Sequence, residues 1–125
     1  MGELLLQEYL PADEDFRLLV IGYEAIPVVV SRRPEPGEFR TNFATRAEFT
    51  ARPIADFPDL KLLAEQGART LRREISGVDI RYKGARPMIL EVNRQPSFEG
   101  FELATRIDVA AEILRYASEK AAAAR

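Results

Sequence analysis

The chain has 125 residues, with 18 basic and 20 acidic side chains and a formal net charge of −2. This length suits a single domain, residues 1–125, and the near balance of charge predicts that neither nucleic acid nor an anionic membrane is the main partner. Cysteine and histidine are both absent from the sequence, which excludes disulfides, thiolate zinc sites, cysteine nucleophiles and Ser-His-Asp triads.

The first segment, Glu3–Leu10, is apolar enough to predict a buried or half-buried strand that Pro11 closes. Its start lacks the basic region of a secretory signal, and no apolar run of the chain approaches the ~20 residues of a membrane span. We therefore expect a cytoplasmic protein.

Two further apolar segments, Phe16–Gly22 and Ala25–Arg33, are joined by a short turn and predict a β-hairpin. Pro27 has no N–H to donate, which indicates a sheet edge or a bulge at that position. The chain from Phe39 to Pro53 predicts irregular structure that could include extended pieces.

A helix is predicted to begin at Asp56 or Asp59, with Pro58 in its first turn, and to end near Glu74. Its apolar positions follow helical spacing and are expected to face the core: Leu60, Leu63, Ala64, Ala68 and Leu71.

A second hairpin is predicted from residues 75–84 and 86–93, followed by a loop at 94–102. The segment from Asp108 to about Lys120 predicts a C-terminal helix, and the last five residues are expected to fray. The expected inward residues of this helix are Val109, Ile113, Leu114 and Ala117. This order of elements predicts one α+β domain with a mainly antiparallel sheet and two main helices.

The second hairpin carries polar residues at positions that alternation places on one face. A loop at residues 84–86 places Asp79 directly opposite Glu91, with Asn93 and Ile89 on the same face as Glu91. A register one residue away would send Asp79 and Glu91 to opposite faces and spoil the apolar pattern. We therefore expect Asp79, Glu91 and Asn93 to lie together.

Two carboxylates that face each other across a ladder repel, at a cost of about 0.2–1 kcal/mol. A divalent cation that prefers oxygen ligands, such as Mg²⁺, would turn this repulsion into coordination, with the Asn93 amide oxygen as a third ligand. The alternative is a solvated polar face on which Arg81 or Arg94 pairs the acids. Spacing alone leaves both readings open.

Arginines provide a second group of candidate residues: Arg17, Arg32 and Arg40, with Asn42 close behind Arg40. Arg17 alternates with Leu19, so it is expected to be partly buried or to lie at a strand end. Guanidinium groups bind phosphate and carboxylate with two parallel hydrogen bonds, which suits an anionic substrate. The alternative for each single arginine is an ordinary surface salt bridge.

Four sequence blocks in this order and spacing resemble a known family: "QEYLPADEDFRLLVIG", "RRPEPGEFRTN", "GVDI" and "LEVNRQPSFEGFE" followed by "RID". They resemble the C-terminal half of ATP-grasp ligases, with RimK-type glutamate ligases the nearest branch and glutathione synthetase a more distant relative. The resemblance covers nearly the whole chain. It implies the C-terminal subdomain of an α+β fold that encloses ATP between two subdomains.

The resemblance also implies an activity: ATP phosphorylates a carboxylate, and an amine attacks the acyl phosphate to form an amide bond. ATP, Mg²⁺ (or Mn²⁺) and an amino-acid or carboxylate substrate are the implied partners. It assigns Asp79, Glu91 and Asn93 as metal ligands. It implies catalytic roles on phosphate or substrate carboxylate for Arg17, Arg32 and Arg40. The implied nucleotide contacts are Gln7, Glu8, Tyr9, Leu10 and Asn42.

The family's preceding subdomain has no counterpart in this sequence, so we expect the chain not to be catalytic alone. It would be a fragment or half of a split ligase that needs an N-terminal half or upstream domain in trans. The alternative is a non-catalytic binding or scaffold module derived from an ATP-grasp enzyme, which could form a homodimer through exposed apolar surface.

Overall fold

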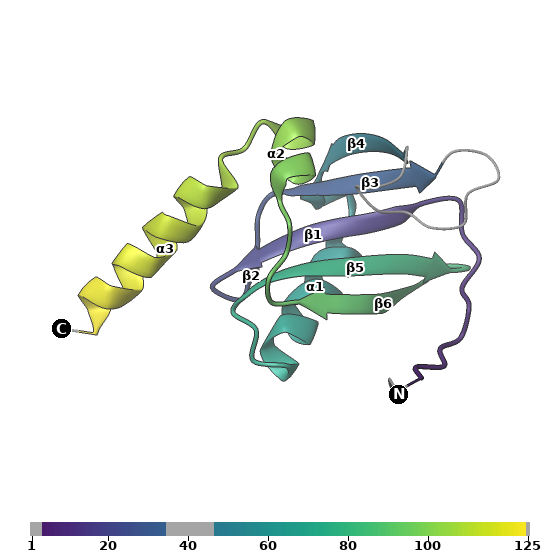
Figure 1. Ribbon diagram of the computed structural model, residues 1–125, viewed down its shortest axis with the longest axis horizontal. Coiled ribbons are helices and arrows are strands. Elements are labelled where there is room, and N and C mark those ends of the chain that lie inside the picture. Colours follow the sequence, from purple (N-terminus) through teal and green to yellow (C-terminus); the bar gives the residue numbers. More distant parts are fainter. Residues whose placement is uncertain (1–3, 35–46, 125) are drawn as a thin grey trace.

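The computed structural model describes residues 4–34 and 47–124. Within them, six strands form one antiparallel sheet: β1 (Asp15–Ile21), β2 (Glu24–Ala25), β3 (Val28–Pro34), β4 (Ala47–Pro53), β5 (Ile75–Lys83) and β6 (Arg86–Asn93). The order is β4-β3-β1-β5-β6, and β2 pairs with β1. A 3-10 turn η1 (Ile54–Asp56) and helices α1 (Pro58–Thr70), α2 (Glu99–Thr105) and α3 (Val109–Ala123) complete the fold (Figure 1). The α+β prediction is confirmed.

The first hairpin joins β1 to β2 through a two-residue turn, because Ile21 pairs with Glu24. Gly22 and Tyr23 have φ angles of 64° and 65°. Two consecutive residues with positive φ make the type I′ turn, whose twist matches that of the flanking strands. Pro27 falls between β2 and β3, which pair with β1 in different registers, so the irregularity expected of a bulge, and not a sheet edge, is found at this position.

The second hairpin has the predicted register at Asp79, but the predicted loop at 84–86 is wrong, because Lys83 pairs with Arg86 and the turn contains only Gly84 and Ala85. Asp79 pairs with Glu91, and Val78 pairs with Val92. A register shift follows at Asp79/Ile80, so that Ile80 pairs with Ile89. The prediction for Ile89 is therefore wrong: the irregularity moves Ile89 from the face of Glu91 to the core face, where it packs beside Val92.

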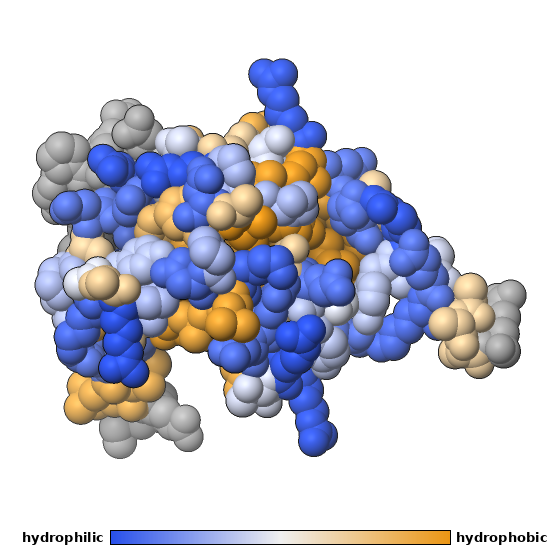
Figure 2. Space-filling model, turned by 180° about the vertical axis from the view of Figure 1, so that it is seen from behind, coloured by the Kyte–Doolittle hydropathy of each residue, from blue (hydrophilic) through white to orange (hydrophobic). Residues whose placement is uncertain are grey.

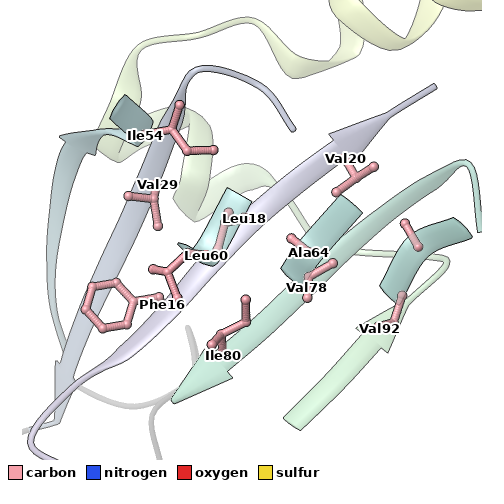
Figure 3. Packing of buried hydrophobic residues seen from close by; sticks show 11 residues of the cluster. Phe16, Leu18, Val20, Val29, Ile54, Leu60, Ala64, Val78, Ile80 and Val92 are labelled. Atoms are coloured by element: carbon pink, nitrogen blue, oxygen red, sulfur yellow. The ribbon is translucent and has the colours of Figure 1, made fainter. Parts of the chain in front are cut away.

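The main core lies between the sheet and α1, as Figure 3 shows from close by. Strand residues of one face meet the apolar side of α1 with almost no exposed surface. The buried members are Phe16, Leu18, Val20, Val29, Ile54, Leu60, Ala64, Ala68, Val78, Ile80 and Val92. Glu65 ties the helix to the first hairpin, because its carboxylate accepts the N–H of Ala25 at 2.8 Å.

A smaller core lies on the opposite face of the sheet, under α2 and the start of α3 (Figure 1). Its buried members are Leu19, Ile26, Val30, Phe101 and Val109. The loop predicted at 94–102 in fact runs into α2, a helix of 7 residues. The sequence did not predict this helix, because Gly100 and Pro96 have low helix propensity. The helix is stabilised by the burial of Phe101 against the sheet.

Helix α1 ends earlier than predicted. Arg72 has a φ of 55°, and the N–H groups of Arg72 and Arg73 donate to the carbonyls of Arg69 and Ala68. These two bonds form a Schellman motif, which stops the helix before Glu74. Leu71 consequently leaves the apolar stripe and is 52% exposed, against the prediction.

Helix α3 begins where predicted, because the side chain of Asp108 accepts the N–H of Ala111 at 2.9 Å. It extends through Ala123, so the expected fraying of the tail is not seen before that residue. The predicted inward positions Leu114 and Ala117 are exposed. The reason is that α3 meets the rest of the molecule along one narrow edge and otherwise points away from it (Figure 1).

The predicted strand at Glu3–Leu10 is wrong for the residues that the structure describes. Residues 4–12 form neither helix nor strand, and Leu4, Leu5 and Leu6 are 93%, 83% and 92% exposed. Strands β4 and β6 already form the edges of the sheet, and this segment pairs with neither. The start of the segment projects from the body of the molecule at the lower left of Figure 2, whereas Leu10 at its end is buried.

The region predicted to be irregular, Phe39–Pro53, ends in the regular strand β4, which pairs with β3 from Val28↔Pro53 onward. The sequence of β4 alternates only weakly between polar and apolar residues. The segment forms a strand because it pairs with β3. Across the described residues, no helix is long and apolar enough to cross a membrane.

Candidate functional site

A cluster of charged side chains occupies the face of the sheet that α1 does not cover. Arg17 on β1 lies directly opposite Asp79 on β5 in the ladder. The Nε of Arg17 donates to Oδ1 of Asp79 at 2.5 Å, and its Nη2 donates to Oδ2 at 3.0 Å. Arg32 reaches from β3 across β1 and donates to the same Oδ1 at 2.9 Å. One carboxylate therefore holds two guanidinium groups.

All three members of this cluster are withdrawn from water: Arg17, Arg32 and Asp79 are 7%, 3% and 8% exposed. Burial lowers the pKa of Arg32, and the neighbouring charge of Arg17 acts in the same direction, while Asp79 opposes the shift. Asp15, a second buried carboxylate near Arg32, likewise opposes the shift. Guanidinium groups are common ligands of phosphate and carboxylate anions.

Gly77 allows the side chain of Arg17 to lie flat over β5. A Cβ at Gly77 would lie 3.2 Å from Nη1 of Arg17 and 2.8 Å from Cβ of Pro96. The same Nη1 donates to the carbonyl of Ser97 at 3.4 Å. Arg17 thus links the cluster to the loop that precedes α2.

A second buried ion pair lies two residues farther along the same strands. Arg81 on β5 holds Asp15 on β1, with Nε to Oδ1 at 2.5 Å and Nη2 to Oδ2 at 3.0 Å. Its Nη1 donates to the carbonyl of Leu10. The hydrogen bond to Asp15 raises the pKa of Arg81. Close by, Lys83 pairs with Glu8 at 2.7 Å.

Glu91 lies opposite Asp79 in the ladder, so both carboxylates belong to this face. Glu91 is exposed and has no ion-pair or hydrogen-bond partner within residues 4–34 and 47–124. The predicted third ligand, Asn93, accepts the N–H of Gln95 at 2.9 Å through its side-chain oxygen. An amide oxygen has two lone pairs, so one stays open to a further partner.

These residues fit a hard cation such as Mg²⁺ in donor chemistry, since they offer two carboxylates and an amide oxygen. No group of three or more acidic residues that could hold a metal occurs in the described part of the chain. A metal here would accordingly take only part of its shell from the protein and would share Asp79 with Arg17 and Arg32. Mg²⁺ usually keeps water and substrate phosphates as its other ligands.

The remaining predicted site residues divide into two groups. Arg40 and Asn42 lie outside the described residues. In the N-terminal segment Gln7, Glu8 and Tyr9 are exposed, whereas Leu10 is buried. The structure thus brings Arg17, Arg32, Asp79 and Glu91 together, and it holds Leu10 close to them through Arg81.

Two residues of this face were missed as site residues by the sequence interpretation. Asp15 lies two positions before Arg17, and alternation alone would put both on one face. Arg81 stands in the same relation to Asp79 but was considered only as a solvent-side partner of the acids. Gly77 carried a further signal, because an isolated glycine within a strand marks close approach of another group.

Comparisons with known proteins identify the family of the chain. Residues 1–117 match the model of a family described as the RimK-like ATP-grasp domain. A probable alpha-L-glutamate ligase from Serratia proteamaculans is 33% identical over 121 residues, which are 95% of this chain and 39% of the relative. A ribosomal protein bS6--L-glutamate ligase from Escherichia coli O81 is 33% identical over 117 residues, which are 92% and 38% of the two chains. The chain thus spans less than two fifths of these relatives.

Solved structures of the ATP-grasp ligase PsnB have a similar fold. The complex of PsnB with a minimal precursor aligns with a TM-score of 0.65 at 24% identity and covers 88% of this chain and 34% of PsnB. The complex with a phosphomimetic precursor variant, Mg and ADP aligns with a TM-score of 0.63 at 23% identity and covers 88% and 35% of the two chains. At this identity the likeness concerns the fold.

The sequence matches establish the family, and the solved structures agree with it in fold. The chain belongs to the RimK-like ATP-grasp domain family.

Proposed function

We propose that this chain is the metal- and phosphate-binding subdomain of an ATP-dependent ligase that joins a carboxylate to an amine. The observation that carries the proposal is the convergence of Arg17 and Arg32 on Asp79, with Glu91 opposite Asp79 on the same face. Family membership supports ATP as the phosphoryl donor. The names of the ligase relatives support L-glutamate as the amino-acid substrate.

Each residue has a distinct role in this proposal. Asp79, Glu91 and Asn93 would hold Mg²⁺ or Mn²⁺, which when bound neutralises charge on the phosphates of ATP. Arg17 and Arg32, with Arg40 as a third candidate, would orient the transferred phosphoryl group or the substrate carboxylate. Their guanidinium groups are already fixed by Asp79, so little reorganisation accompanies the reaction.

The nucleotide base would contact the N-terminal segment, with Gln7, Glu8, Tyr9 and Leu10 as the candidate residues and Asn42 as a further polar contact. Because the chain spans under two fifths of its ligase relatives, we propose that a complementary N-terminal half in cis or in trans completes the site. Residues 1–125 would then be one partial ATP-grasp domain that is not catalytic alone.

Calorimetry with Mg²⁺ and ATP tests the proposal on the chain itself. Asp79→Asn and Glu91→Gln are each expected to weaken binding of Mg²⁺–ATP roughly tenfold or more, since each removes one ligand charge. Glu24→Gln is the matched control, because Glu24 is an exposed acid on β2, opposite Ile21 at the end of β1 that lies away from Arg17 and Asp79. Wild-type binding no tighter than that of Asp79→Asn would rule out a metal site.

A second candidate function is a non-catalytic scaffold module that forms a homodimer. The exposure of Leu4, Leu5 and Leu6, at 83–93%, favours it because apolar segments of this kind tend to find partners. A solution mass equal to one chain at high protein concentration would count against this alternative.

A further inference from the structure

We propose that Arg81 is a positioning residue that fixes the segment Gln7–Leu10 against the sheet and thereby increases the affinity for the base of a bound nucleotide. This inference rests on the proposed function. It separates the part of the site that would read the base from the part that would hold metal and phosphate.

Every nitrogen of the Arg81 guanidinium donates to the protein. Nε and Nη2 hold both oxygens of Asp15, and Nη1 holds the carbonyl of Leu10. The side chains of Arg81 and Asp15 are only 12% and 5% exposed. The planar guanidinium of Arg81 binds two partners, the carboxylate of Asp15 on β1 and the carbonyl of Leu10, and so fixes the position of one relative to the other. The ammonium group of a lysine, a single point charge, would not do this.

The segment depends on this contact more than on its own structure. Residues 4–12 form neither helix nor strand, and Leu10 is buried while the residues before it are exposed. The other ion pair of the segment, Glu8 with Lys83, is exposed at 63% and 59%. Exposed pairs of this type contribute little to stability, so Arg81 is the main polar anchor within the described residues.

Strand β5 connects this anchor to the metal face. Asp79, Arg81 and Lys83 alternate along one face of β5, at a rise of about 3.3 Å per residue. One rigid strand therefore sets the position of Asp79 and, through Arg81, that of the segment. A nucleotide with its phosphates near Asp79 would have its base directed toward residues whose placement Arg81 controls.

The affinities for two ligands, one with a base and one without, distinguish a role of Arg81 in base binding from a general effect on the stability of the fold. Arg81→Lys keeps a positive charge beside the buried Asp15 but removes the planar guanidinium that binds Asp15 and Leu10 at the same time. It is expected to weaken binding of Mg²⁺–ATP roughly tenfold and to change binding of Mg²⁺–tripolyphosphate, which has no base, by less than about twofold. The ¹⁵N heteronuclear NOE of the amides of residues 7–10 is expected to fall at the same time.

Arg115→Lys is the control, because the guanidinium of Arg115 also pairs with a carboxylate, that of Glu112 on α3, but contacts neither Asp15 nor Leu10. It should leave both affinities and the NOE values of residues 7–10 unchanged. If the wild type binds both ligands and Arg81→Lys weakens them equally or not at all, the role of Arg81 is overturned while the proposed function stands. If the wild type binds neither ligand better than Asp79→Asn, the proposed function fails, and the inference with it.

Discussion

The two faces of the sheet are built from the same strands, and both bury apolar side chains, but only one of them also buries a group of charged side chains. Toward α1, the buried strand residues are almost all apolar, and Leu18, Val78 and Ile80 are 0% exposed. Toward α2, the same strands bury four charged residues at 3–8% exposure: Asp15, Arg17, Arg32 and Asp79.

Burial of apolar surface stabilises a fold by ~25 cal/mol per Å². A buried ion pair offers no such net gain, because desolvation offsets most of the attraction and an apolar replacement is often equally stable. The apolar burial on the α1 face therefore contributes most of the stability of the fold. The charged face is explained better by a functional requirement.

The largest effect is expected from Asp79→Ala. It leaves the guanidinium groups of Arg17 and Arg32 buried without their carboxylate, so the free energy of unfolding should fall by about 3–5 kcal/mol. Urea denaturation followed by circular dichroism measures the change. A loss below about 1 kcal/mol would show that water reaches these arginines and that the face is not truly buried.

A triple variant, Arg17→Met, Arg32→Met and Asp79→Leu, is compared with Asp79→Ala. It replaces the whole cluster by apolar side chains, so no buried charge is left without a partner. If function retains these charges, the free energy of unfolding should be unchanged or higher by up to about 4 kcal/mol, while binding of Mg²⁺–ATP is lost. If the triple variant is as unstable as Asp79→Ala, the charged cluster itself stabilises the fold, and the functional explanation is wrong.

Leu60→Ala disrupts the apolar core between the sheet and α1, on the face opposite the charged cluster. Leu60 is 0% exposed in the core under α1, so its truncation should lower the free energy of unfolding by about 2–5 kcal/mol. At a temperature where the variant is folded, its affinity for Mg²⁺–ATP should equal that of the wild type. A parallel loss of affinity would contradict the separation of the two faces.

The smallest effect concerns α3. Glu74 accepts hydrogen bonds from Lys120 at 2.7 Å and from Tyr116 at 2.5 Å, and these bonds lower the pKa of Glu74 in the folded state. The contribution of this contact is therefore present above the unfolded pKa and is lost as the pH falls through the folded pKa.

Amide exchange in α3, measured by NMR between pH 7 and pH 3, should consequently rise at the acid end relative to α1. Glu74→Gln should make the α3 rates higher at neutral pH and remove most of this extra dependence. Identical pH profiles of α3 in the wild type and in Glu74→Gln would show that Glu74 does not hold the helix.

Much of the fold and part of the site are local properties of the sequence. Alternation of polar and apolar residues predicts Asp79 opposite Glu91. The two-residue turn between Lys83 and Arg86 would alone pair Asp79 with Leu90, and the irregularity at Asp79/Ile80 restores the predicted pair. The absence of histidine and cysteine limits the chemistry to carboxylates, amides and guanidinium groups. The cap at Asp108 likewise marks the start of α3.

Only the tertiary structure decided how these pieces meet. The reach of Arg32 across β1 to Asp79 depends on the strand order β3-β1-β5. The Arg81–Asp15 pair needs β1 beside β5, although 66 positions separate the two residues in the sequence. Contacts of this kind are set by the packing of whole strands, and no pattern within a single strand contains them.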